Sequence, residues 1–340
     1  MKTICIIGGG SLGHVCAGVF AANGYRVSML TGHPDKWEKE ISVIDCEGKV
    51  FSGSLTVISS SPEEVIPQAD IVLLCLPGYL IEDKLREIAP FVSPKTLVGS
   101  IVSSTGFFFI AHRILPATTQ LFGFQRVPFI ARVDQYGKSA KLLGYKSLLK
   151  IAVENCTYSR DFAIELSVVL KTPVTLLDNY YEASLTNSNP ILHTGRLFTL
   201  WRDPQSRRPI KNPIMFYSDW TDEASETLIA MDEEFGELLK VLGVSREVVP
   251  TLLDYYESSD AKGLTAKLRS IPAFMPIPAP MKKIDEGWVP DFSSRYFTED
   301  FPYGLRYIRD FARMHNIPTP VIDRVYSWGL SVISLGSLNI

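Results

Sequence analysis

The feature that most constrains this 340-residue chain is a glycine pattern near its start. A short apolar run, Lys2–Ile7, predicts a strand, and Leu12–Asn23 predicts a helix lined with small residues. Between them, glycines at positions 8, 10 and 13 form a G-x-G-x-x-G motif. A match between a strand and a helix is typical of a dinucleotide-binding βαβ unit.

Each residue of the motif has a physical role in binding a pyrophosphate. Gly8 permits the sharp turn, Gly10 lets the backbone approach the phosphates, and Gly13 allows close helix–strand packing. The helix N-terminus offers unpaired N–H groups to an anion. We therefore expect Gly8, Gly10, Ser11, Leu12 and Gly13 to belong to the cofactor-binding site.

The rest of the first half alternates strand-like and helix-like segments. Ala69–Leu76 is a nearly continuous apolar run, typical of a strand buried on both faces of a parallel sheet. Strands and helices in this alternation predict an α/β fold, a doubly wound Rossmann sheet. The other expected strands are Tyr25–Leu30, an Ile41–Asp45 and Val50–Ser59 pair, Thr96–Val102, Thr119–Phe124, Lys141–Leu143, Leu148–Val153 and Val174–Leu177.

The second half has a different texture, and we place a domain boundary near residue 178. Residues 1–178 form the predicted NAD(P)-binding domain, and residues 179–340 a mostly α-helical substrate domain. The proline-rich stretch Ile271–Pro290 is expected to be an irregular loop. Helices are expected over Ser184–Trp201, Asp222–Leu242, Arg246–Tyr256, Gly304–His315 and Pro320–Ser334.

Composition narrows the class of protein. Hydrophobic residues make up 46% and charged residues 21% of the chain, as in soluble globular proteins. The net charge of −3 gives no basic field for a nucleic-acid partner. No apolar run is long enough to span a membrane. The five scattered cysteines lack CxxC spacing, which favours a reduced cytoplasmic protein without a disulfide framework or metal site. The oligomeric state stays open, with a homodimer among the options.

The choice between NAD and NADP also stays open. Thr31 occupies the end of the second strand, where an acidic residue usually binds the ribose and selects NAD. His33 and Lys36 follow, and their charge gives a slight preference for NADP. Leu76 and Pro77 follow the buried strand at its carboxyl end, which faces the ligand crevice in open α/β sheets.

Two segments of the second half carry groups suited to proton transfer and anion binding. The first is NSNPILH, which ends at His193, and the second is RYFTEDFPYGL, which begins at Arg295 and includes Asp300. In these segments the chain resembles the opine dehydrogenase family, which comprises octopine, nopaline and related N-(carboxyalkyl) amino acid dehydrogenases. The second block is close to that family's RY-x-TED-x-P-x-G pattern, and the VPF-x-AR stretch at 127–132 and LGYKS at 143–147 extend the likeness.

The resemblance implies a reductive amination, in which an amino acid and a 2-oxo acid form an imine that NAD(P)H reduces. It implies that His193 is the general acid/base, Asp300 its orienting partner and Arg295 the clamp for a substrate carboxylate. Family members commonly have His-Pro where this chain has His193-Thr194. The residue types suit the reaction, because histidine exchanges protons near neutrality and guanidinium grips carboxylates in a bidentate fork.

Three further residues are candidate substrate contacts, and two other functions are compatible with the sequence. Ser104, at the end of a strand, and Arg132 are candidate substrate-binding residues, and Arg196 is a candidate for a second carboxylate. One alternative is a ketopantoate-reductase-like or 2-hydroxy-acid dehydrogenase that reduces a ketone, although no lysine has comparable motif support. A second alternative is a dinucleotide-binding sensor without turnover, since fold alone does not establish function.

Overall fold

The computed structural model describes residues 1–337 and divides into two compact units, Met1–Ser184 and Leu185–Ile340. The predicted boundary at residue 178 lies just before α6 (Tyr180–Ser184), whose Tyr180 ring packs 5.3 Å from Phe108 within the first unit. Within residues 1–337, no helix is both long and apolar enough to cross a membrane. The same residues contain no group of three His, Cys, Asp or Glu side chains placed to hold a metal ion.

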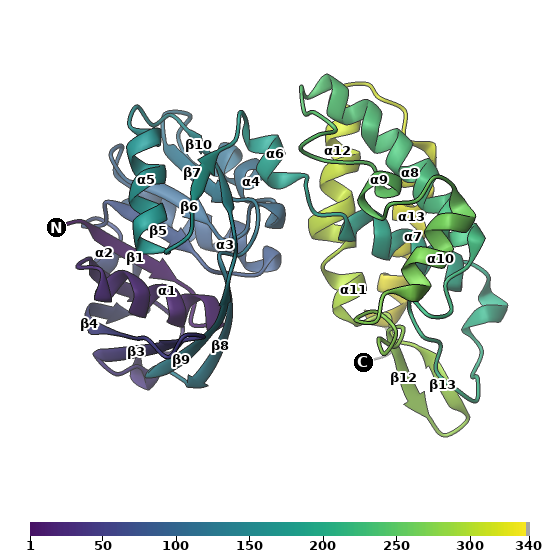
Figure 1. The fold of residues 1–340 in the computed structure, drawn as a ribbon, viewed down its shortest axis with the longest axis horizontal. Coiled ribbons are helices and arrows are strands. Elements are labelled where there is room, and N and C mark those ends of the chain that lie inside the picture. The colour runs from purple at the N-terminus through teal and green to yellow at the C-terminus, as the bar shows by residue number, and fades with distance from the viewer. Residues whose placement is uncertain (338–340) are drawn as a thin grey trace. The chain divides into compact units, whose positions relative to one another are not determined.

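The first unit is built on a mixed sheet that, among the described residues, has eleven strands (Figure 1). Their order is β11-β10-β7-β6-β5-β1-β2-β4-β3-β9-β8. The six strands from β7 to β4 in this order run parallel, which confirms the predicted doubly wound α/β class. The strands are β1 (Thr3–Ile7), β2 (Arg26–Leu30), β3 (Glu40–Asp45), β4 (Val50–Ser59), β5 (Ile71–Leu74), β6 (Leu97–Ser100), β7 (Gln120–Phe124), β8 (Phe129–Gln135), β9 (Ser139–Tyr145), β10 (Leu149–Glu154) and β11 (Val174–Leu176).

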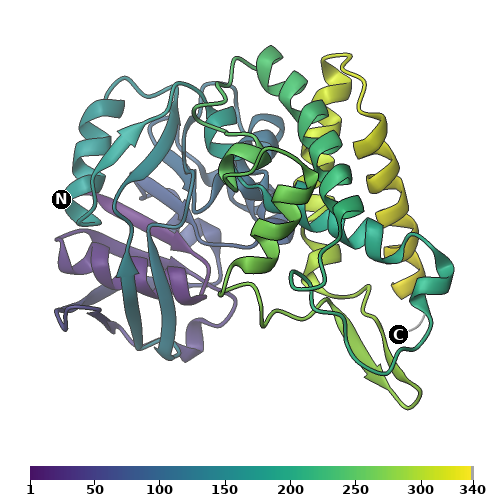
Figure 2. The ribbon, with the colours of Figure 1, turned by 45° about the vertical axis from the view of Figure 1, so that its right-hand side comes forward.

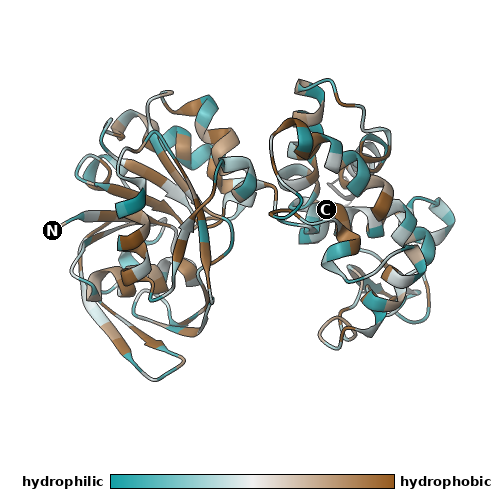
Figure 3. Ribbon diagram, turned by 45° about the horizontal axis from the view of Figure 1, so that its top comes forward, coloured by the Kyte–Doolittle hydropathy of each residue, from teal (hydrophilic) through white to brown (hydrophobic). Residues whose placement is uncertain are grey.

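Helices cover this sheet, which explains the uninterrupted apolar composition of its central strands. All four residues of β5 are buried, and Figure 3 shows that hydrophobic residues predominate in the strands. A parallel strand covered on both faces needs no polar alternation. The helices of the unit are α1 (Ser11–Ala22), α2 (Pro62–Val65), α3 (Gly78–Ile88), α4 (Phe107–Ile114), α5 (Ser159–Val169) and α6.

The hairpin β8–β9 extends the sheet past α1. Strand β9 pairs in parallel with β3, and β8 pairs antiparallel with β9 at the edge. Figure 2 shows these two long strands beside α1. Strand β8 is absent from the sequence-based prediction, because it is an edge strand whose half-exposed segment, FIARVDQ, includes charged residues. Its backbone nonetheless contacts the glycine motif, since the Val133 N–H donates to Ser11 Oγ at 3.2 Å.

The second unit is mostly α-helical, as predicted. Helix α7 packs against α8 and α13, with the rings of Trp201 and Trp220 fully buried. The elements are α7 (Asn189–Trp201), α8 (Asp222–Val241), α9 (Leu252–Tyr255), α10 (Ala261–Ser270), β12 (Met281–Ile284), β13 (Gly287–Pro290), α11 (Arg295–Thr298), a single π-helical turn (Phe301–Leu305), α12 (Arg306–Met314) and α13 (Pro320–Ser337).

Two sequence-based predictions in this unit are wrong. The helix expected over Arg246–Tyr256 is confined to α9, because Pro250 cannot continue a helical hydrogen-bond ladder and Thr251 caps a new turn through the Asp254 N–H at 3.0 Å. The expected irregular loop Ile271–Pro290 contains the β12–β13 hairpin, whose turn ends at Gly287 with a φ of +135°. Only glycine adopts that backbone conformation readily.

Candidate active site

The glycine motif has the geometry that close backbone packing requires. Gly8 has a φ of +114°, and a Cβ there would lie 2.7 Å from the Cys75 carbonyl oxygen. A Cβ on Gly13 would lie 1.9 Å from the Gly8 carbonyl oxygen, inside any permitted contact. A Cβ on Gly10 would meet nothing within 4 Å. Gly8 and Gly13 therefore serve the internal packing of the turn, whereas Gly10 faces open space.

The N-terminus of α1 has the features of an anion site. Gly10 is its N-cap residue and supplies no side-chain cap, so the first turn keeps its unpaired N–H groups. Ser11 and Leu12 begin the helix, with the Ser11 hydroxyl accepting from Val133. The uncapped helix end and the open space at Gly10 fit a dinucleotide pyrophosphate.

His14 holds this loop against the β8–β9 hairpin, a role that the sequence analysis missed. Its Nδ1 lies 2.9 Å from the Gly10 carbonyl oxygen, and its Nε2 lies 2.7 Å from the Gly137 backbone nitrogen. An N–H must donate to Nε2, so the ring is neutral and carries its proton on Nδ1. Burial lowers the pKa of His14, which is fully inaccessible to solvent.

The remaining predicted cofactor residues lie around the same turn. Thr31 is buried, and its Oγ1 would be 3.1 Å from a Cβ on Gly9. Leu76 lies against Gly8, with its Cδ2 2.9 Å from the Cβ position there, and Pro77 caps α3. Lys36 is exposed at the end of a short 3-10 turn.

The two substrate-binding candidates of the first unit, Ser104 and Arg132, lie on different elements of the sheet unit. Ser104 is half-buried in a 3-10 turn, Ser103–Thr105, that follows β6. Arg132 is exposed on β8, where its guanidinium donates to the carbonyl of the adjacent Ala131 at 2.9 Å.

In the second unit, the start of α7 is stabilised locally, and this fixes the position of His193. The Asn187 side chain accepts from the Asn189 N–H at 3.2 Å, and Pro190 occupies the first turn, where its missing N–H costs nothing. The buried Thr194 hydroxyl donates to the Pro190 carbonyl. Threonine after His193 is therefore accommodated within a regular helix.

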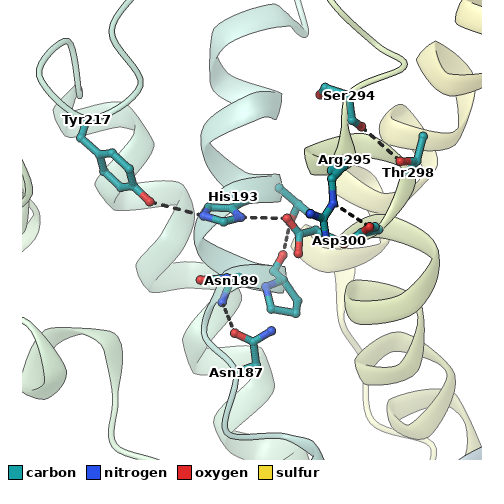
Figure 4. A network of polar contacts seen from close by, with 11 residues as sticks. Asn187, Asn189, His193, Tyr217, Ser294, Arg295, Thr298 and Asp300 are labelled. Atoms are coloured by element: carbon teal, nitrogen blue, oxygen red, sulfur yellow. Dashed lines mark hydrogen bonds and ion pairs between the residues drawn. The ribbon is translucent and has the colours of Figure 1, made fainter. Parts of the chain in front are cut away.

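His193 and Asp300, which are 107 positions apart, are in direct contact (Figure 4). His193 Nδ1 lies 2.8 Å from Asp300 Oδ2, and both side chains are mostly buried, 13% and 18% exposed. Asp300 precedes the π-helical turn, whose Phe301 is buried and stacked on Phe297. A Cβ on Gly304 of this turn would lie 2.6 Å from Pro190 Cγ, so glycine brings the turn against α7.

Two tyrosines contact the His193 ring. The Tyr217 hydroxyl lies 3.3 Å from Nε2, and the Tyr296 ring centroid lies 4.6 Å from that of His193. Burial raises the pKa of both phenols, so both stay protonated near neutrality. Tyr217 is not among the site residues predicted from the sequence, because no spacing signal links it to His193.

Two arginines of this unit differ in solvent exposure. Arg295 is 81% exposed and forms a bidentate ion pair with Glu299 at 2.8 and 2.9 Å. Arg196 is buried, and its guanidinium donates to the carbonyls of Phe216 and Asp219. Burial lowers the pKa of Arg196 to about 10. The interpretation of Arg196 as a substrate contact is not supported, because its guanidinium is buried and bonds to backbone carbonyls inside the unit.

The arrangement around His193 suits proton transfer. With Nδ1–H donating to Asp300, the carboxylate fixes the tautomer and stabilises the imidazolium form. Nε2, which faces the Tyr217 hydroxyl, is then the nitrogen of the neutral ring that can accept a proton.

Comparison with known proteins agrees with both units. Residues 176–333 match the family model described as NAD/NADP octopine/nopaline dehydrogenase, alpha-helical domain. Residues 4–106 match the model for ketopantoate reductase. The chain is 25% identical over 365 residues to opine dehydrogenase from Haliotis discus hannai, covering 96% of this chain and 89% of that protein. It is 26% identical over 356 residues to octopine dehydrogenase from Mizuhopecten yessoensis, covering 96% and 88%.

A solved structure of octopine dehydrogenase with NADH and L-arginine has the same fold. It has a TM-score of 0.86 and 24% identity, and the match covers 98% of this chain and 90% of that one.

Proposed function

The chain belongs to the opine dehydrogenase family, and from that premise we propose that it reductively condenses an amino acid with a 2-oxo acid, using NAD(P)H. The observation that carries the proposal is the contact of 2.8 Å between His193 and Asp300. It lies within the residues that match the helical-domain model of the octopine and nopaline dehydrogenases.

The residues of the glycine motif would hold the cofactor. The α1 N-terminus, uncapped by a side chain, would bind the pyrophosphate beside Gly10, and Thr31 would contact the adenosine ribose. Lys36, Leu76 and Pro77 complete the proposed cofactor residues. When bound, the reduced nicotinamide supplies a hydride. Rates of oxidation measured with NADH and with NADPH decide between the two cofactors.

The proposed substrate residues would bind the substrate and exchange a proton with its reacting centre. His193 exchanges a proton with the reacting centre through Nε2, and Asp300 holds the ring in that tautomer. Arg295 would bind a substrate carboxylate in the position that the Glu299 carboxylate occupies, since both are planar two-oxygen acceptors. Ser104 and Arg132 remain proposed substrate contacts.

A second candidate function is the reduction of a ketone without an amine. The match of residues 4–106 to the ketopantoate reductase model favours it. That match covers nucleotide-binding elements, whereas the helical unit carries the proposed acid/base pair, so we rank it second. A dinucleotide-binding sensor without turnover is the third.

The proposed partners are small molecules, an amino acid and a 2-oxo acid. The net charge of −3 argues against a nucleic acid as a partner, because such a partner requires a basic surface. All five cysteines are unpaired, in keeping with a proposed cytoplasmic location.

The test is a matrix of amino acids against pyruvate, 2-oxoglutarate and other 2-oxo acids, with NADH or NADPH oxidation followed at 340 nm. We expect oxidation that requires both the amine and the oxo acid. Oxidation with the oxo acid alone would move the function to ketone reduction. Cofactor binding without NADH or NADPH oxidation for any substrate pair would support a dinucleotide-binding sensor without turnover.

A further inference from the structure

The Tyr217 hydroxyl faces the nitrogen of His193 that exchanges protons. With Nδ1–H bonded to Asp300, the neutral ring accepts at Nε2, so the Tyr217 O–H donates to it across 3.3 Å. Once Nε2 is protonated it no longer accepts from the phenol, so the ring N–H and the phenol O–H can both donate to a third group. A single oxygen placed beside both groups would accept from both.

The chain fixes the Tyr217 ring in this position from several sides. Arg196 donates to the carbonyls of Phe216 and Asp219, at 3.2 and 2.5 Å, and so holds the backbone on both sides of Tyr217. The Tyr217 ring stacks on Phe274 at 4.2 Å and on Trp220 at 5.8 Å. Arg196 lies three residues after His193 on α7, so one helix sets the positions of both groups. Figure 4 shows the Tyr217 side chain pointing at His193 from a separate segment.

The condensation of an amine with a 2-oxo acid has a demand that ketone reduction lacks, namely the loss of an oxygen atom. The nitrogen lone pair attacks the carbonyl carbon, and the C=O π pair moves to oxygen, leaving an oxyanion beside an ammonium. One proton passes from nitrogen to this oxygen, and a second comes from the His193 imidazolium. The C–O bond then breaks, water leaves, and the nitrogen lone pair forms the C=N bond of the iminium.

We infer that Tyr217 is a catalytic residue of this dehydration, donating a hydrogen bond to the departing oxygen while His193 protonates it. The inference rests on the proposed function and deepens it. Tyr217 keeps its own proton throughout, because burial raises the pKa of its phenol. Two convergent donors stabilise an oxyanion better than one, and removing one such donor costs roughly 10²-fold or more in rate.

The test compares Tyr217→Phe with the wild-type enzyme and with Tyr326→Phe. Both variants remove a phenol hydroxyl from a buried ring in the same unit, but Tyr326 lies on α13 under the Arg309 guanidinium. The Tyr217→Phe variant keeps the aromatic ring and therefore its stacking contacts, and thermal unfolding of each variant checks this. Rates are measured with the best amine and oxo acid, using NAD(P)H with either hydrogen or deuterium at C4.

We expect kcat/KM for the oxo acid to fall by roughly 10²-fold in Tyr217→Phe, with a deuterium isotope effect near 1. That result means that a step before reduction limits the variant. An unchanged rate, or a loss with an isotope effect clearly above 1, would overturn the role in dehydration. A failure of the proposed function gives a different result, namely that the wild-type enzyme oxidises NAD(P)H without an amine. That result would overturn both the reductive condensation and the role of Tyr217.

Discussion

The glycine turn of the first unit and the acid/base pair of the second unit are built in different ways. The turn is made by backbone atoms within six consecutive residues, Gly8–Gly13, and its shape depends on missing side chains. The His193–Asp300 pair is made by side chains 107 positions apart, brought together by α7 and the π-helical turn. At Gly8 and Gly13 the turn has no room for an added Cβ, whereas the side-chain site depends on each functional group.

The largest expected effect is on the side-chain site. His193→Ala should lower kcat/KM by about 10²- to 10⁴-fold, because the proton donor is lost, and leave the Kd for NAD(P)H unchanged. Steady-state rates measure kcat/KM, and fluorescence titration of the cofactor measures its Kd. The exposed His315 provides the control variant, His315→Ala, which should keep full activity.

Asp300→Asn tests whether the two residues work as a unit. An amide no longer stabilises the imidazolium, so the single variant should lose activity, and the double variant with His193→Ala should lose little more than His193→Ala alone. Fully additive losses would show that the contact of 2.8 Å is structural rather than functional.

The backbone site offers a matched pair of glycine variants. Gly13→Ala places a Cβ 1.9 Å from the Gly8 carbonyl oxygen and should lower the free energy of unfolding by about 1–3 kcal/mol. Gly10→Ala meets no atom within 4 Å, so it should leave stability nearly unchanged and weaken cofactor binding. Denaturant unfolding and cofactor titration separate the two, and equal destabilisation of both would break the distinction.

Arg295 tests the proposed carboxylate clamp, with Glu299 as its partner. Arg295→Lys should raise KM for the oxo acid by roughly tenfold, since lysine lacks the bidentate fork. Glu299→Gln should lower that KM, because the competing carboxylate is removed. A fall in kcat with KM unchanged in Arg295→Lys would argue against a binding role.

The smallest expected effect is on pH-dependent stability through His14. Its pKa is lowered by burial in the folded state, whereas an unfolded histidine titrates near pH 6.5. Below about pH 6.5 the unfolded chain therefore binds a proton that the folded chain does not bind. The free energy of unfolding consequently decreases as the pH is lowered below this value. Urea unfolding at pH 7 and 5.5 should show a decline that is smaller in His14→Gln, by less than about 1 kcal/mol. An equal decline in both proteins would contradict the assignment.

The same contrast explains what the sequence could predict. The glycine turn, the parallel strands and the helical second unit follow from local patterns, which act over a few residues. Strand β8 and the β12–β13 hairpin escaped prediction because pairing partners, not local propensity, define them. His193 and Asp300 were joined by family resemblance, since no spacing encodes their contact. Tyr217 and His14 were missed because a buried aromatic ring gives no signal of what its polar atom faces.

The most direct test of the central claim follows two atoms into one product. The enzyme is incubated with a ¹⁵N-labelled amino acid, its 2-oxo acid and C4-deuterated NAD(P)H, and the products are analysed by mass spectrometry. The account predicts a secondary amine dicarboxylate that carries both ¹⁵N and deuterium, and its loss in His193→Ala. Deuterium found only in a 2-hydroxy acid, with no ¹⁵N-labelled product, would contradict it.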